Sequence, residues 1–141
     1  MKHMKKWAGA LLITRSGEVI LQKRDTRPDI INPGKIALFG GSLEESENIE
    51  DGLKREIKEE IGLDIVGFSF FGLYKKRRIS HGEDCDCYVY LVGNINVGDI
   101  NVKEGRGYVL VSAHDNYQTS EEYSLITRSV LDDYFKQPNK N

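Results

Sequence analysis

The stretch from Gly41 to Leu63 constrains this chain most strongly, because it combines a glycine turn, a helical repeat and clustered acids. A glycine pair follows the apolar run 36–39, which predicts that a strand ends there and the chain turns. Apolar side chains then recur every fourth residue and predict one buried helical stripe from about Asn48, formed by Ile49, Leu53, Ile57 and Ile61. We expect Gly62 to end this helix as its C-terminal cap.

Three carboxylates lie beside the apolar stripe of this predicted helix. Glu56, Glu59 and Glu60 are spaced three and four residues apart, so they share one helical face within an arc of roughly 100°. Like charges at these spacings each cost an isolated helix roughly 0.2 to 0.5 kcal/mol. A divalent cation with oxygen ligands would offset this repulsion directly. The plainer alternative is an acidic helix face exposed to water.

The spacing of the same stretch matches a known motif. Every fixed place of the Nudix box is filled, by Gly41, Glu47, Arg55, Glu56, Ile57, Glu59, Glu60, Gly62 and Leu63. At average residue frequencies, such a coincidence has a probability on the order of 10⁻⁷ or less. The chain therefore resembles the Nudix hydrolases, specifically MutT-like members. Many of these carry proline before the glycine pair, where this chain has Phe39.

The resemblance implies a fold, a cofactor and a reaction. The fold is an α/β/α sandwich around a mixed β-sheet, and the reaction is cleavage of a nucleoside diphosphate linked to a variable group. Mg²⁺, or alternatively Mn²⁺, is the implied cofactor. By resemblance, the metal ligands are the backbone carbonyl of Gly40 and the carboxylates of Glu56, Glu59, Glu60 and Glu104.

The resemblance also implies roles for other residues of the box. Either Glu56 or Glu59 acts as the general base. Arg55 completes the catalytic set and, with Glu47, is expected to orient the loop and helix through an ion pair. Gly62 has a structural role in the motif.

The remaining predicted site residues lie on either side of the box. Lys23 and Arg24 end a predicted strand and are expected to hold a substrate phosphate, although they equally suit an exposed loop. Phe39 and Gly41 are expected to form part of the substrate wall. The segment 103–106 resembles the acidic segment found in triphosphate-cleaving members, and this assigns Glu104 to the metal site; an exposed turn is the alternative.

Length and composition limit the other possibilities. With 141 residues, 39% of them apolar, we expect a single Nudix domain spanning 1–141, with a frayed tail after about residue 137. A formal charge of −2 disfavours a long nucleic-acid partner but suits a small nucleotide. No membrane span is predicted, and the expected location is cytoplasmic. The pattern leaves open whether the protein is a monomer or a homodimer.

Alternation of apolar and polar residues predicts the other elements. Strands are expected at 7–14, 19–23, 65–74, 85–92 and 108–111, with a bulge at Gly67 or Gly72. The basic run 75–78 suits a solvated hairpin, or a phosphate contact together with His81. A last helix is expected to begin after Ser120, to bury Tyr123, Ile126, Val130, Leu131 and Tyr134, and to end before Pro138.

Two cysteines, Cys85 and Cys87, are one residue apart, so in a strand they share a face. They are poorly placed to bridge each other in a disulfide. A zinc site with His81 lacks a further ligand pair, and reduced thiols are therefore expected.

Three functions compete on this evidence. The leading one is a diphosphatase that converts a (deoxy)nucleoside triphosphate to a monophosphate and pyrophosphate. A pyrophosphatase of nucleotide sugars or ADP-ribose is the nearest alternative, and a non-catalytic nucleotide-binding regulator is the third. The aromatic side chain that would contact the base is left open among Phe39, Tyr74, Tyr88, Tyr117 and Tyr123.

Overall fold

The computed structural model describes residues 5–29, 33–78 and 83–137. The predicted contributions of His81 and Pro138 and the tail after residue 137 lie outside these ranges. The described residues form a seven-stranded sheet, two α-helices and one short 3₁₀ helix. The strands are β1 Lys5–Thr14, β2 Val19–Lys23, β3 Ile36–Ala37, β4 Phe39–Ser42, β5 Ser69–Arg78, β6 Glu83–Ile95 and β7 Tyr108–Val111. The helices are α1 Ile49–Ile61, η1 Val97–Asp99 and α2 Leu125–Phe135.

The sheet is mixed and is centred on β1. Its strand order is β3-β2-β1-β6-β5, with β4 paired to β1 and β7 paired to β2. β1 and β6 are parallel, whereas β2 and β4 pair with β1 in the antiparallel sense. The predicted α/β class with a mixed sheet is confirmed.

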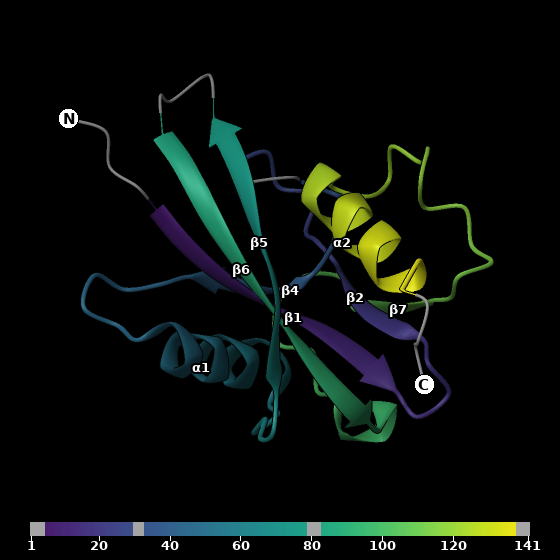
Figure 1. Cartoon of the computed structure of the whole chain (residues 1–141), viewed down its shortest axis with the longest axis horizontal. Coiled ribbons are helices and arrows are strands. Elements are labelled where there is room, and N and C mark those ends of the chain that lie inside the picture. The colour runs from purple at the N-terminus through teal and green to yellow at the C-terminus, as the bar shows by residue number, and fades with distance from the viewer. Residues whose placement is uncertain (1–4, 30–32, 79–82, 138–141) are drawn as a thin grey trace.

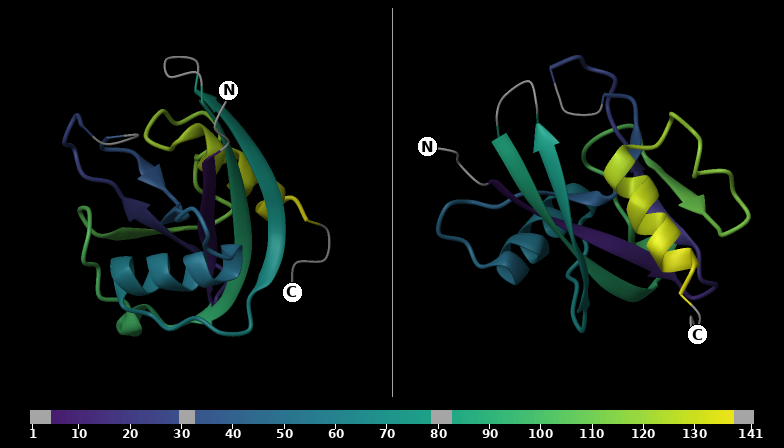
Figure 2. Two further views of the ribbon diagram at one scale, coloured as in Figure 1. Left: turned by 90° about the vertical axis from the view of Figure 1, so that its left-hand side faces the viewer. Right: turned by 45° about the horizontal axis from the view of Figure 1, so that its top comes forward.

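The two α-helices cover opposite faces of this sheet, and alternation along β1 explains how (Figure 1, Figure 2). Ala8, Ala10 and Leu12 belong to the core beneath α1, while Leu11 and Ile13 belong to the core beneath α2. One continuous apolar strand therefore serves two hydrophobic cores. The arrangement is the sandwich that the resemblance implied.

Helix α1 begins and ends where the sequence predicts. The side chain of Asn48 accepts hydrogen bonds from the backbone N–H groups of Glu50 and Asp51, at 2.9 and 3.3 Å. Gly62 follows the helix with a left-handed φ of 73°, and its N–H donates to the carbonyl of Lys58. Both ends of the helix are thus capped by local interactions.

The prediction that the chain turns at the glycine pair is wrong. Gly40 and Gly41 lie inside β4, and the break falls at Leu38, where the chain passes from pairing with β2 to pairing with β1. A Cβ on Gly40 would lie 2.2 Å from the carbonyl oxygen of Ala8, and one on Gly41 would lie 2.2 Å from Oε2 of Glu56. Glycine is therefore required at Gly40, where the neighbour is backbone, and at Gly41 it leaves room for the flexible end of Glu56.

The predicted cap of the last helix is also wrong. Helix α2 begins at Leu125, and its cap is Ser124, whose Oγ accepts from the N–H of Thr127. Backbone hydrogen bonds join Ile36 to residues 122 and 124, and Tyr123 forms a parallel bridge with Ile36. This pairing with β3 keeps the chain after Ser120 extended, so Tyr123 precedes the helix that it was expected to join.

The hairpin of β5 and β6 differs from its prediction in extent. β5 starts four residues later than expected and continues through the basic run to Arg78, while β6 extends at both ends. A register shift between Phe70 and Gly72 places a bulge at Phe71, next to Gly72, which was one of the two expected positions.

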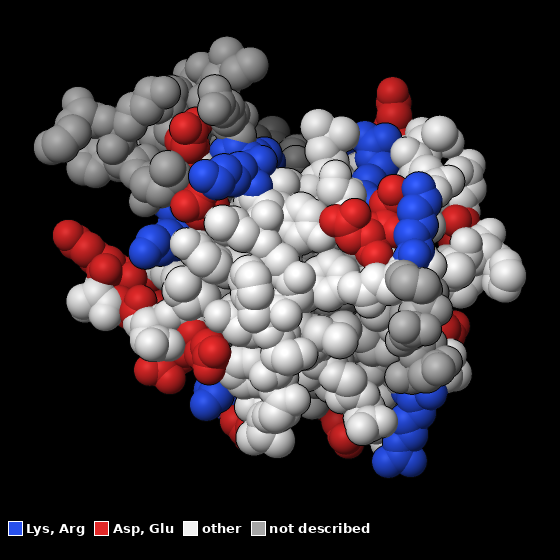
Figure 3. All heavy atoms as spheres, in the orientation of Figure 1, with Lys and Arg blue, Asp and Glu red and all other residues white. Residues whose placement is uncertain are grey.

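Charges of both signs are interspersed around the rim of the face shown in Figure 3, and its centre is largely uncharged. Among the described helices, none is long and apolar enough to cross a membrane.

Candidate active site

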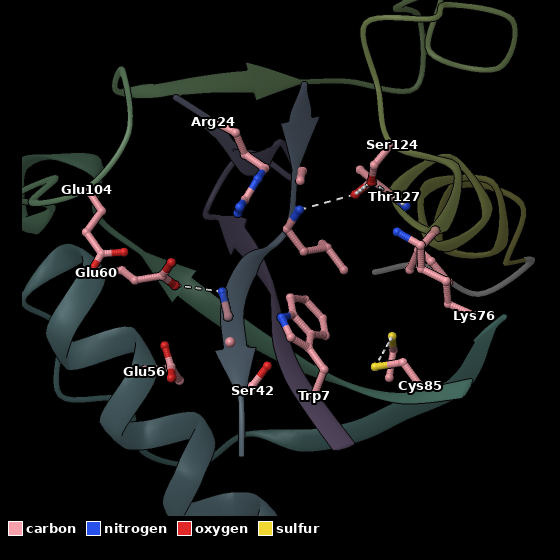
Figure 4. Close-up of a pocket in the computed structure, with 16 residues that line it drawn as sticks. Trp7, Arg24, Ser42, Glu56, Glu60, Lys76, Cys85, Glu104, Ser124 and Thr127 are labelled. Atoms are coloured by element: carbon pink, nitrogen blue, oxygen red, sulfur yellow. Dashed lines mark hydrogen bonds between the residues drawn. The ribbon is translucent and has the colours of Figure 1, made fainter. Parts of the chain in front are cut away.

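A cavity of about 320 Å³ is bordered by α1, β4 and the start of α2 (Figure 4). Its two ends differ in chemistry. The carboxylate end is formed by Glu56, Glu60 and Glu104, and the thiol end by Trp7, Lys76, Cys85 and Cys87. The backbone of β4 lies between them, and Ser124 and Thr127, near the start of α2, line the cavity on the side of the thiol end.

Glu60 is the most deeply buried acid of the carboxylate end. Its residue is 3% exposed, and its Oε1 accepts a hydrogen bond of 2.7 Å from the N–H of Gly40. Burial raises the pKa of Glu60 to about 8 despite that hydrogen bond, and the nearby charges of Glu56 and Glu104 contribute to the increase. The carboxyl group of Glu60 therefore holds a proton near neutral pH unless a cation lies beside it.

Glu104 reaches the carboxylate end because its loop is bound to two elements. The N–H of Lys103 donates to the carbonyl of Glu60 at 2.8 Å, and the N–H of Arg106 donates to the carbonyl of Lys23 at 2.8 Å. The Arg106 side chain also donates to the carbonyl of Arg24 at 2.9 Å. These bonds place Glu104 next to the last turn of α1.

Arg55 connects the loop before α1 to the acids of the helix. Its Nε and Nη2 donate to the two carboxylate oxygens of Glu47, at 2.6 and 2.8 Å, so the predicted ion pair is present. Its Nη1 donates to Glu56 at 3.0 Å and to Glu59 at 3.3 Å. The hydrogen bond from Arg55 lowers the pKa of Glu47 to about 2. Arg55 thus holds the Glu56 side chain from outside the cavity.

Burial raises the pKa of Glu56, and this effect exceeds the opposing effect of the Arg55 charge. Glu56 and Glu60 therefore share two properties. Each carboxyl group is at least partly buried, and each lies close to other acidic groups. Arg24 lines the same end of the cavity, and its charge lowers the pKa of Glu60 only as the smallest contribution. The carboxylate end has an excess of acidic groups.

Some of the other predicted site residues line the cavity and some do not. Gly41 and Arg24 line the cavity, whereas Lys23 does not. The Glu59 side chain is 54% exposed and also lies outside the cavity lining. Phe39 is completely buried in the core beneath α1 and does not line the cavity.

Sequence analysis missed the aromatic residue of the cavity. None of the five aromatic candidates lines it, and Tyr117 and Tyr123 are buried in the core beneath α2. Trp7 lines it instead, next to Cys87 in the register between β1 and β6. The missed hydroxyls of Ser124 and Thr127 come from a helix start that had been placed four residues too early. No local signal marks Trp7, because its role depends on strand pairing.

The donor set of the carboxylate end suits a hard divalent cation. Within the described residues, no three His, Cys, Asp or Glu side chains are already arranged to hold a metal ion. Mg²⁺ is usually bound by one or two carboxylates, with waters and substrate phosphates completing its ligands. Buried acids with raised pKa values, such as Glu56 and Glu60, fit that requirement because a cation would compensate their charge.

Comparison with known proteins identifies the family. A model of the NUDIX domain matches residues 4–130. The chain belongs to the Nudix hydrolase family. It is therefore a hydrolase of pyrophosphate bonds, as the box implied. It is 30% identical over 129 residues to the nucleoside triphosphatase NudI of Escherichia coli O139:H28, a match that covers 85% of this chain and 89% of that protein.

Solved structures of the family have the same fold as this Nudix hydrolase. A MutT NUDIX hydrolase from Burkholderia pseudomallei superimposes with a TM-score of 0.77 at 25% identity, over 93% of this chain and 98% of that one. A MutT protein from Methanosarcina mazei Go1 gives a TM-score of 0.83 at 24% identity, over 99% and 98%. The similarity extends over nearly the whole chain.

Proposed function

We propose that this Nudix hydrolase is a Mg²⁺-dependent diphosphatase that converts a (deoxy)nucleoside triphosphate to the monophosphate and pyrophosphate. The observation that carries the proposal is the convergence of Glu56, Glu60 and Glu104 at one end of a cavity beside Arg24. The similarity to a nucleoside triphosphatase supports the choice of substrate. We assign the activity to the cytoplasm, where the thiols of Cys85 and Cys87 remain reduced.

The ligands of the cation would be Glu56, Glu59, Glu60 and Glu104 with the carbonyl of Gly40. An ion held there would supply charge neutralisation at phosphate oxygens and a lower pKa of water. Glu59 would have to give up its contact with Arg55 to join this set, and at 3.3 Å that contact is long for a charged pair.

The protein side chains perform the remaining steps. Arg24 binds a phosphate oxygen and increases the electrophilicity of phosphorus. Glu56, held in place by Arg55, accepts a proton from the attacking water; Glu59 is the alternative base. The water oxygen forms the new P–O bond, the phosphoanhydride P–O bond breaks, and pyrophosphate leaves. One triphosphate and one water thus yield one monophosphate and one pyrophosphate.

The test is product analysis across a substrate panel. The purified chain is incubated with ribo- and deoxynucleoside triphosphates, nucleotide sugars and ADP-ribose, with Mg²⁺, with Mn²⁺ or with a chelator. We expect monophosphate and pyrophosphate in equal amounts from at least one triphosphate, only when a divalent ion is present. Much higher kcat/KM for a nucleotide sugar or ADP-ribose would replace the proposed substrate class. Nucleotide binding without turnover under every condition would instead indicate a regulator.

A further inference from the structure

The thiol end of the cavity contains two sulfur atoms placed side by side. Cys85 and Cys87 are alternate residues of β6, so both side chains lie on one face of the strand. Their Sγ atoms are 3.9 Å apart, and both residues line the cavity (Figure 4). The sulfur pair is separated from the carboxylates by β4 and Trp7, and nothing in the proposed reaction uses it.

A disulfide between these cysteines would lie at the edge of the usual geometry. Alternate residues of an extended strand are about 6.6 Å apart. This separation is close to the upper limit of about 6.8 Å between the Cα atoms of a disulfide. Cys87 is also held in register by Trp7 of β1 and Tyr74 of β5, so the backbone is paired on both sides. A disulfide would bring the Sγ atoms from 3.9 Å to about 2.05 Å, while the paired backbone opposes movement toward the commoner, shorter Cα separation.

A single metal ion, by contrast, fits between the two sulfurs without movement of the strand. Zinc–sulfur bonds are about 2.3 Å long. Two sulfurs 3.9 Å apart then subtend an angle of roughly 115° at the ion, near the tetrahedral value. We propose that Cys85 and Cys87 form a bidentate site for a thiophilic divalent cation such as Zn²⁺ or Cd²⁺, and that an ion bound there blocks the nucleotide cavity.

The charges and the burial around the two thiols determine how metal binding depends on pH. Lys76 lies opposite Cys85 in the pairing of β5 with β6, and its charge lowers the pKa of Cys87. The hydrogen bond with Cys85 and burial have larger effects, and together they raise the pKa of Cys87 above its ordinary value. Without metal, the Cys87 thiol therefore holds its proton. One ion and two thiols give the dithiolate complex and two released protons, so affinity increases with pH.

The two ends of the cavity thus prefer different metals. Carboxylates suit Mg²⁺ and thiolates suit Zn²⁺ or Cd²⁺. The phosphates of the proposed nucleotide bind at the carboxylate end, so the rest of the nucleotide needs the space beside Trp7. An ion at the thiol end would occupy that space. This consequence rests on the proposed function, whereas the binding of the ion does not.

The test is a titration of the metal-free chain with Cd²⁺ in excess Mg²⁺, which competes at the carboxylates. The first readout is the ultraviolet charge-transfer band of a cadmium thiolate, which carboxylates do not give. The second is the fluorescence of Trp7, the single tryptophan of the chain, which lines the same cavity. We expect both signals to saturate at one equivalent, and Glu104→Gln, altered at the opposite end, to retain them.

Removing either sulfur should weaken Cd²⁺ binding at least about tenfold, because a bidentate site becomes monodentate. Cys85→Ser is the primary variant because Cys85 is the more exposed of the two; Cys87→Ser and the double variant follow, with folding checked by circular dichroism. Absence of the band in wild type, or its persistence in the double variant, would overturn the site.

Hydrolysis is measured separately, each protein relative to its own rate without Cd²⁺. We expect inhibition of wild type at the Cd²⁺ concentration that saturates the band, and resistance in the double variant. A band without inhibition would overturn the blocking role while supporting the metal site. Inhibition that is equal in the double variant would place the inhibitory ion elsewhere. A chain without hydrolytic activity still gives the spectroscopic result, so failure of the proposed function is distinguishable.

Discussion

Helices α1 and α2 cover opposite faces of the same sheet, yet they contribute different chemistry. Helix α1 combines a buried apolar stripe with acids that reach the cavity, and Glu60 is buried with them. Helix α2 contributes apolar packing through Val130 and Leu131, and two hydroxyl groups near its start. The difference arises from β4, whose glycines let the acids of α1 approach the strand closely. The candidate site therefore forms where the acids of α1 pack against the backbone of β4.

Substitution of an acid of α1 should produce the largest difference between the effect on activity and the effect on stability. Glu56→Gln should lower kcat by about 10³-fold, because it removes a base and a charge from the site. Thermal stability should stay equal or increase, since burial and the charges of Glu59 and Glu104 oppose the ionised form of Glu56. The measurements are steady-state kinetics with Mg²⁺ and thermal unfolding. Wild-type turnover in this variant would remove Glu56 from the mechanism.

Glu59→Gln is the matched variant on the exposed side of the same helix turn. It should also lower kcat severely if Glu59 ligates the ion, although its side chain lies outside the cavity lining. Retention of wild-type turnover would exclude Glu59 as ligand and base, leaving Glu56, Glu60 and Glu104.

A cavity created by mutation in the core beneath α2 should lower stability and leave turnover unchanged, the opposite of the result expected for Glu56→Gln. Leu131 is completely buried, so Leu131→Ala should cost about 2–5 kcal/mol in the free energy of unfolding. Turnover per folded molecule should remain close to wild type, because Leu131 does not line the cavity. The equivalent change on α1, Leu53→Ala, should cost similar stability and reduce turnover as well. Denaturant unfolding and kinetics of both variants decide whether the two helices differ in this way.

The two helix caps provide a smaller comparison. Asn48→Ala should cost about 1 kcal/mol, the usual value for an N-cap. Ser124→Ala should cost more, about 1–3 kcal/mol, because Ser124 is buried and its hydroxyl also donates to Thr127 Oγ1 at 2.7 Å. Urea unfolding of both variants measures the difference. Equal losses would show that the buried hydroxyl pair adds nothing to the cap.

The smallest effect concerns pH and Glu47. Its pKa is lowered from 4.5 to about 2 in the folded chain, so its stabilising contribution is complete above the unfolded pKa. That contribution is lost as pH falls through the folded pKa. The stability difference between wild type and Glu47→Gln should therefore narrow from about pH 6 to about pH 3, measured by urea unfolding with a chelator. A constant difference would mean that the Arg55 pair does not depend on the charge of Glu47.

Prediction from sequence succeeded where the signals were local. The caps at Asn48 and Gly62 lie next to the helix that they end, and the repeat of α1 needs only its own residues. Prediction failed where a distant strand decided the conformation. The pairing of residues 122–124 with Ile36 delayed α2, and β1 drew Gly40 and Gly41 into a strand. Hydrogen bonds between segments far apart in sequence leave no local pattern.

The sequence by itself determined the family, helix α1 and the acids on its face, because a helical repeat and a fixed motif are contained within one short segment. Only the tertiary structure decided that Glu104 lies beside Glu60, that burial raises the pKa of Glu60, and that Trp7 and two sulfurs form the opposite end of the cavity. The reason is physical: burial, charge interaction and strand register depend on contacts between residues that the chain brings together only by folding.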